Sequence, residues 1–207
     1  TLAVEIDTAA AAGTRVRINS WSDGWTGPSR TITINTRETI HLSVHAYREH
    51  QLMVAPANPD LGSAWAEIEG GGKLAADTWV PEGMKIVLNV QPAADTLYFV
   101  YWDGQAAGMT PKELAKIQPG SVISIQGPSE FRAVLAPRIR GGYTIADALL
   151  GDPNVVPESI RRYLDVLGNQ NGRLDVGDYI IGLQEGVLKR DGNTLKLEIP
   201  LPNSNQP

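Results

Sequence analysis

The sequence contains no cysteine, and this absence excludes several chemistries at once. Without cysteine the chain forms no disulfide, holds no thiolate-ligated metal and offers no thiolate nucleophile. It also lacks an apolar run long enough to cross a bilayer as a helix. The sequence shows no signal peptide, so if the protein is secreted, this is its processed form. We expect a location outside the cell or at its surface.

Clusters of basic residues are missing too. The chain has 18 Lys and Arg residues against 23 Asp and Glu residues, which gives a formal net charge of −5. Its N-terminal arginines, among them Arg15, Arg17 and Arg30, are spread over predicted strands and turns. Nucleic acids and anionic membrane surfaces bind clustered Lys and Arg, so neither is an expected partner.

Familiar catalytic signatures are also lacking. The sequence has no nucleophile elbow, no metalloprotease helix, no phosphate-binding loop and no glycine-rich dinucleotide fingerprint. We therefore expect a protein that is not an enzyme.

What the sequence does contain, through its first 140 residues, is mostly β patterning. Apolar and polar residues alternate over residues 15–18, 40–46 and 84–90, and 21 glycines and 14 prolines punctuate the chain. Residues 97–102 are almost continuously apolar, which predicts a central strand buried on both faces. Seven or more short strands predict a mainly β fold, with an immunoglobulin-like β-sandwich over residues 15–140.

The first 14 residues form a separate strand and linker. Leu2, Val4 and Ile6 alternate with polar or small residues, and residues 8–13 follow as an alanine-rich linker. That linker is too long for a tight hairpin. The strand can therefore fold into its own sheet or leave the molecule and complete a neighbour's sheet by β-strand addition.

Helical patterns appear later in the chain. Thr110, Pro111 and Glu113 form a capping box, which predicts a short helix over residues 111–117. Residues 141–190 read as a helical segment, with helices over 144–150, from 157 through 167 and over about 176–187. Residues 191–201 read as a strand that returns to the sandwich, and residues 202–207 as a disordered tail.

Between the last two predicted helices lies a loop with the spacing of an EF-hand. Gly172 falls at the sixth position of that pattern, where a sharp turn is needed. The candidate oxygen ligands for Ca²⁺ are Asp165, Asn169, Asn171, the Arg173 carbonyl, Asp175 and Asp178.

This loop resembles the calcium loop of dockerin modules, in a single repeat. Leu167 stands where the first aspartate ligand belongs, and Asp165 lies two residues too early. The alternative is that Asn169, Asn171 and Asp175 hold a turn through Asx hydrogen bonds, with Asp175 capping the following helix and no metal present.

Three functional interpretations follow. The first is a structural subunit of an extracellular bacterial filament, a homopolymer formed head to tail by donation of the strand that carries Leu2, Val4 and Ile6. Its organisation resembles that of donor-strand-exchange fibre subunits, without a shared motif. The second is a monomeric cell-surface or carbohydrate-binding module with Trp21 and Trp25 as a platform for glycans, and the third is a non-catalytic domain of a secreted hydrolase.

Overall fold

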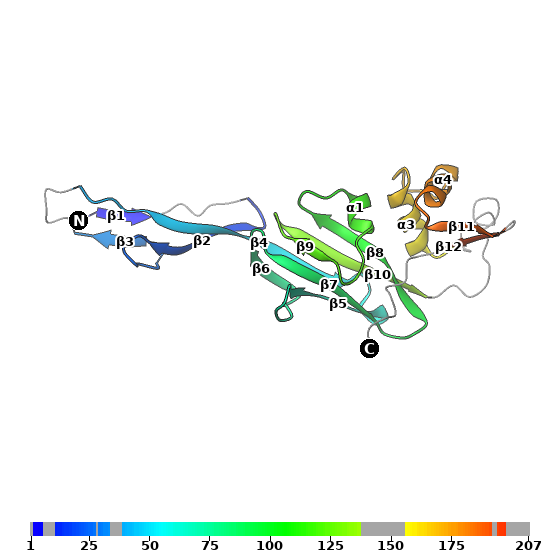
Figure 1. Cartoon of the computed structure of the whole chain (residues 1–207), viewed down its shortest axis with the longest axis horizontal. Coiled ribbons are helices and arrows are strands. Elements are labelled where there is room, and N and C mark those ends of the chain that lie inside the picture. Colours follow the sequence, from blue (N-terminus) through cyan, green and yellow to red (C-terminus); the bar gives the residue numbers. More distant parts are fainter. Residues whose placement is uncertain are drawn as a thin grey trace.

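The computed structural model is an elongated molecule in which a narrow β-arm projects from a layered body (Figure 1). It describes residues 2–5, 11–27, 29–33, 39–137, 156–191 and 194–197. The fold is mainly β, as predicted. We define the arm as β1 (Leu2–Glu5), β2 (Thr14–Trp21), β3 (Ser29–Ile32) and residues 44–48 of β4 (Val44–Pro56).

Two sheets and a set of helices make up the body. The larger sheet continues into the arm through β2 and has the order β2-β4-β10-β8, with β6 on the other side of β4. The smaller sheet has the order β5-β7-β9. The remaining elements of these sheets are β5 (Gly62–Ile68), β6 (Asp77–Pro81), β7 (Lys85–Pro92), β8 (Leu97–Ala106), β9 (Val122–Ser124) and β10 (Ser129–Pro137). The other described elements are the short 3-10 helix η1 (Pro59–Leu61), the helices α1 (Pro111–Ala115), α3 (Glu158–Leu167) and α4 (Val176–Gln184), and the strands β11 (Leu188–Asp191) and β12 (Thr194–Leu197).

Strand β4 joins the arm to the body. Its first half pairs with β2, and its second half pairs with β6 on one side and, in parallel, with β10 on the other. The sequence pattern predicted a strand over residues 40–46 here. The structure has one strand of 13 residues, because no glycine or proline interrupts residues 44–54.

The first hydrophobic core lies between the two sheets. Leu52 and Val54 of β4 meet Ile86 and Leu88 of β7 there, together with aromatic side chains from β8 and β10. The clean alternation predicted over residues 84–90 is confirmed, since Ile86 and Leu88 point into this core.

A second core covers the opposite face of β8 and β10, where α3 packs. The ring of Tyr101 on β8 stacks on that of Tyr163 on α3 with centroids 5.4 Å apart. Burial raises the pKa of both phenols to about 12. The register between β8 and β10 shifts at Val134, and this irregularity lets the consecutive residues Val100 and Tyr101 both enter the second core.

Strand β8 is thus buried on both faces, as its apolar run predicted, but it is not central. It stands at the end of the strand order β2-β4-β10-β8 among the described strands. Its burial comes from layers above and below: the smaller sheet covers one face and α3 covers the other.

The end of the chain differs from the prediction. Strand β12 pairs with β11 in a two-stranded sheet, and no described strand of the sandwich pairs with it. The rest of the strand predicted over residues 191–201, which is residues 192, 193 and 198–201, lies outside the described residues. The helix predicted over residues 144–150 and the tail 202–207 lie outside the described residues.

Candidate functional site

The first candidate site is the N-terminal strand. Strand β1 pairs antiparallel with β3, with Leu2 opposite Ile32 and Val4 opposite Arg30. These strands form a two-stranded sheet in the arm, apart from the sheets of the body (Figure 1). Ile6, the third residue of the predicted partner-binding set, lies outside the described residues. β1 therefore pairs with β3 and not with β2, the next strand in the sequence. This is consistent with a linker that is too long for a tight hairpin between β1 and β2.

The base of the arm holds a charged cluster that the sequence pattern did not single out. Glu49 of β4 is largely buried and accepts a hydrogen bond from Arg15 Nε at 2.5 Å. Arg17 Nε lies 3.7 Å from the same carboxylate oxygen. The Arg15 guanidinium also lies over the ring of Trp79, 4.3 Å from its centroid. The alternation of charged residues in 15–17 predicted the strand, but not the partners on β4 and β6.

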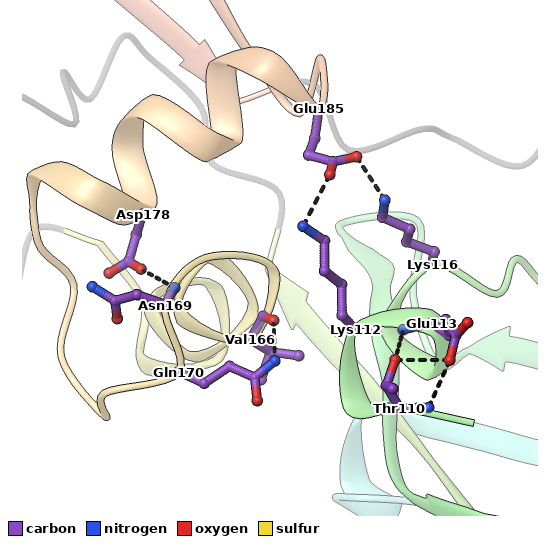
Figure 2. A network of polar contacts seen from close by, with 9 residues as sticks. All are labelled: Thr110, Lys112, Glu113, Lys116, Val166, Asn169, Gln170, Asp178 and Glu185. Atoms are coloured by element: carbon purple, nitrogen blue, oxygen red, sulfur yellow. Dashed lines mark hydrogen bonds and ion pairs between the residues drawn. The ribbon is translucent and has the colours of Figure 1, made fainter. Parts of the chain in front are cut away.

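The second candidate site is the loop between α3 and α4. Asp178 is fully buried, and its carboxylate accepts hydrogen bonds from the backbone N–H groups of Asn169 at 3.0 Å and Asp175 at 2.9 Å. A Cβ atom on Gly168 would lie 2.0 Å from Asp178 Oδ1, so this close approach requires glycine there. Figure 2 shows the Asn169–Asp178 contact, which ties the start of the loop to the first turn of α4.

Asp175 caps α4, as the alternative interpretation predicted. Its Oδ1 accepts from the backbone N–H of Gly177 at 2.7 Å, and Asp178 completes a capping box. Its Oδ2 accepts from the side-chain amides of Asn169 at 3.0 Å and Asn171 at 2.7 Å. These amide hydrogen bonds, with the backbone ones, hold the pKa of the Asp175 carboxyl below its usual value.

The remaining predicted ligands also take part in closing the loop. Both oxygens of Asp165 lie within 3.2 Å of the Gly172 backbone nitrogen. The Asn171 side-chain oxygen accepts from the backbone N–H of Arg173 at 2.9 Å, which is an Asx turn. The structure therefore brings the predicted side-chain ligands together. Their oxygens accept hydrogen bonds from N–H groups of the loop and of the first turn of α4.

This arrangement does not present a ready metal cage. Among the residues that the structure describes, no three His, Asp or Glu side chains are grouped so that they could hold a metal ion. The amide groups that point at Asp175 are hydrogen-bond donors, which a cation would have to displace. The hydrogen bonds thus support the alternative in which the loop is held without a metal, and calcium binding stays a prediction.

A bridge of opposite charges fixes α4 to the body. Glu185, which ends α4, accepts from Lys116 Nζ at 2.6 Å and lies 3.0 Å from Lys112 Nζ. Both lysines come from the region of α1, whose own predicted capping box of Thr110 and Glu113 is present (Figure 2). The two hydrogen bonds to Glu185 hold its pKa below the usual value.

The tryptophans do not form the predicted platform. Trp21 is only 3% exposed, and its Nε1 donates to the carbonyl of Gly27 at 2.9 Å. Trp25 is 48% exposed and donates to the carbonyl of Ser29. Because one ring of the pair is buried, Trp21 and Trp25 do not offer a joint surface for a sugar.

Comparison with protein-family models, with curated proteins and with solved structures finds no match for this chain. Within the described part of the chain, no helix is both long and apolar enough to cross a membrane.

Proposed function

We propose that this chain is the structural subunit of an extracellular filament, which polymerises when the N-terminal strand of one copy inserts into the β-structure of its neighbour. The observation that supports this most directly is the pairing of β1. Among the described strands, β1 pairs with β3 alone, in a two-stranded sheet.

A strand held in this way costs little to release. Isolated two-stranded ribbons are marginally stable in water, because they bury little apolar surface. Only four residue pairs join β1 to β3. In a neighbour, burial of Leu2, Val4 and Ile6 would contribute about 1.5–3 kcal/mol per side chain, from which the cost of ordering must be subtracted.

The geometry of such a contact leads to a filament. Each copy gives one strand and receives another, so the contact is head to tail and does not need to close into a ring. In this proposal the body is an immunoglobulin-like sandwich, supported by its two sheets around a shared core. The segment from α3 to α4 is a dockerin-like brace on the far side of β8 and β10.

A reversible lock tests the proposal on one sample. Because the chain has no cysteine, the double variant Val4→Cys/Arg30→Cys carries a single possible disulfide, at a directly opposed pair of β1 and β3. We expect the oxidised protein to stay monomeric and the reduced protein to form filaments, as seen by light scattering and negative-stain microscopy.

Deletion of residues 1–7 provides a second, independent test. The truncated chain should remain folded by circular dichroism and lose the ability to polymerise. A matched control is Ala3→Ser, which leaves Leu2, Val4 and Ile6 in place. The proposal fails if the unlocked wild-type chain remains a monomer, or if the deletion leaves the size of the polymers unchanged. Unchanged size together with binding to a glycan array would favour the monomeric carbohydrate-binding module.

A further inference from the structure

The edge of β2 that faces away from β4 matches the N-terminal strand in two ways: in its alternation of apolar and charged side chains, and in the opposite sign of the charges. We propose that it accepts the N-terminal strand of a second copy in antiparallel pairing, an inference that rests on the function proposed above. The register we assign has four opposed pairs: Val4 with Ile18, Glu5 with Arg17, Ile6 with Val16 and Asp7 with Arg15.

This edge is open among the described strands. Strand β2 pairs with β4 along one side, and no other described strand pairs with it. Two other strands at sheet ends, β8 and β5, already make contacts beyond their strand partners. The helix α1 packs against β8, and the backbone N–H of Leu74 donates to the carbonyl of Ala66 on β5.

The two segments match face by face. On β2, the apolar Val16 and Ile18 share one face and are half-buried, whereas Arg15 and Arg17 share the other. On the N-terminal strand, apolar and acidic residues alternate in the same way. Directly opposed residues lie on the same face, so this register sets apolar against apolar and acid against base. A slip of one residue in either direction would set Ile6 opposite an arginine and Val16 opposite an acidic residue.

The matched stretch ends where β2 becomes irregular. The register of β2 on β4 shifts between Ile18 and Ser20, which leaves Asn19 as an extra residue. The four opposed pairs all lie before this point, within regular strand.

The charges on β2 are available for a second partner. The side chain of Arg17 is 57% exposed, and it lies 3.7 Å from Glu49. A guanidinium carries five N–H donors, so Arg17 can bind a further carboxylate beside Glu49. Two arginines surround one buried glutamate on this face, which leaves a positive charge for the acidic residues of the incoming strand. Exposed ion pairs contribute little affinity, and here they select the register.

Cysteine cross-linking tests the assignment, because the natural chain contributes no background thiol. The full chains Val4→Cys and Ile18→Cys are mixed, allowed to polymerise and oxidised. We expect a disulfide-linked dimer that contains one copy of each variant, since opposed Cα atoms in antiparallel strands are spaced as a disulfide requires. The matched control Asn19→Cys, next along β2 at the extra residue, should lose this cross-link. The pair Glu5→Cys and Arg17→Cys repeats the test on the other face.

The outcomes separate this inference from the function on which it rests. Cross-linking of Val4→Cys to Tyr47→Cys on β4 instead would show that the β2 edge is not the acceptor. If a chain carrying both Val4→Cys and Ile18→Cys closes its disulfide within one monomer, the β2 edge does not accept a second copy. Filaments that still form and still need residues 1–7 would then keep the proposed function while overturning the edge. Absence of filaments from the wild-type chain overturns both.

Discussion

The arm and the body of this molecule are built from the same kind of strand but differ in what covers those strands. In the body, β8 and β10 are covered on one face by the smaller sheet and on the other by α3. In the arm, β2 and residues 44–48 of β4 form a ribbon whose side chains are mostly half-buried or exposed. The exception is Trp21, which its own loop covers.

This difference indicates where stability and assembly reside. Burial of apolar surface is the main favourable term in folding, so the body carries most of the stability. The arm instead keeps backbone donors and acceptors at its edges, which can pair with another chain. The predictions below test this division of roles.

The largest contrast is expected between an aromatic side chain of the body and one of the arm. Phe131 on β10 is 0% exposed and packs edge-on against Trp102, whereas Tyr47 on β4 is 41% exposed. Phe131→Ala should lower the free energy of unfolding by about 3–5 kcal/mol, because it leaves a cavity in a packed core. Tyr47→Ala should change it by about 0.5 kcal/mol or less.

Urea denaturation followed by tryptophan fluorescence measures both variants. Equal losses in the two would show that the arm folds as part of the same packed unit, and the contrast between arm and body would then be wrong.

A smaller difference is expected between a buried carboxylate of the body and an exposed one of the arm. Asp178→Ala removes the acceptor of two backbone N–H groups at the base of α4. We expect a loss of about 1–3 kcal/mol, the cost of leaving buried donors unsatisfied. Asp23, in the loop that joins the arm strands β2 and β3, is exposed and accepts from Trp25 N at 3.4 Å. We expect Asp23→Ala to cost about 0.5 kcal/mol or less.

Chemical denaturation of the two variants provides the comparison. A larger loss for Asp23→Ala than for Asp178→Ala would contradict the assignment of stability to the body.

Glu185, in the body, should contribute to the loss of stability of the folded chain at low pH. Hydrogen bonds from Lys116 and Lys112 lower the pKa of its carboxyl below the ordinary 4.5. A lowered pKa in the folded state means that stabilisation is complete above the ordinary value and is lost as the pH falls through the folded value. We expect Glu185→Gln to lower the melting temperature at neutral pH and to match the wild type in acid.

Melting curves at a series of pH values test this prediction. The control is Glu82→Gln, which removes a carboxylate in a longer, exposed ion pair: Glu82 lies 3.9 Å from Arg48 at the base of the arm. A constant difference between Glu185→Gln and the wild type at every pH would contradict the role of the charge.

The sequence predicted helix caps and other local structure better than it predicted the order of strands in the sheets and what packs on their faces. The capping box of α1 and the Asp175 cap of α4 were found because each depends on residues three positions apart. The position of β8 at the end of its sheet could not be found in this way, because a strand covered above and below has the same apolar run as a central strand. Likewise, no local pattern relates residues 2–5 to residues 29–32, since strand pairing across such a separation leaves no periodic signal in either segment.

The smallest effect is expected from removal of calcium, and it distinguishes the two interpretations of the loop between α3 and α4. The oxygens of Asp165, Asp175 and Asp178 already accept hydrogen bonds from N–H groups of the loop. We therefore expect that a chelator leaves the melting temperature of the full chain unchanged, since these hydrogen bonds join the same residues that a cation would hold together. A drop in melting temperature that added Ca²⁺ restores, and that Asp175→Ala and Asp178→Ala abolish, would instead establish the dockerin-like site. Calcium would then displace the amides of Asn169 and Asn171 from Asp175, and the brace of the body would be a metal-dependent one.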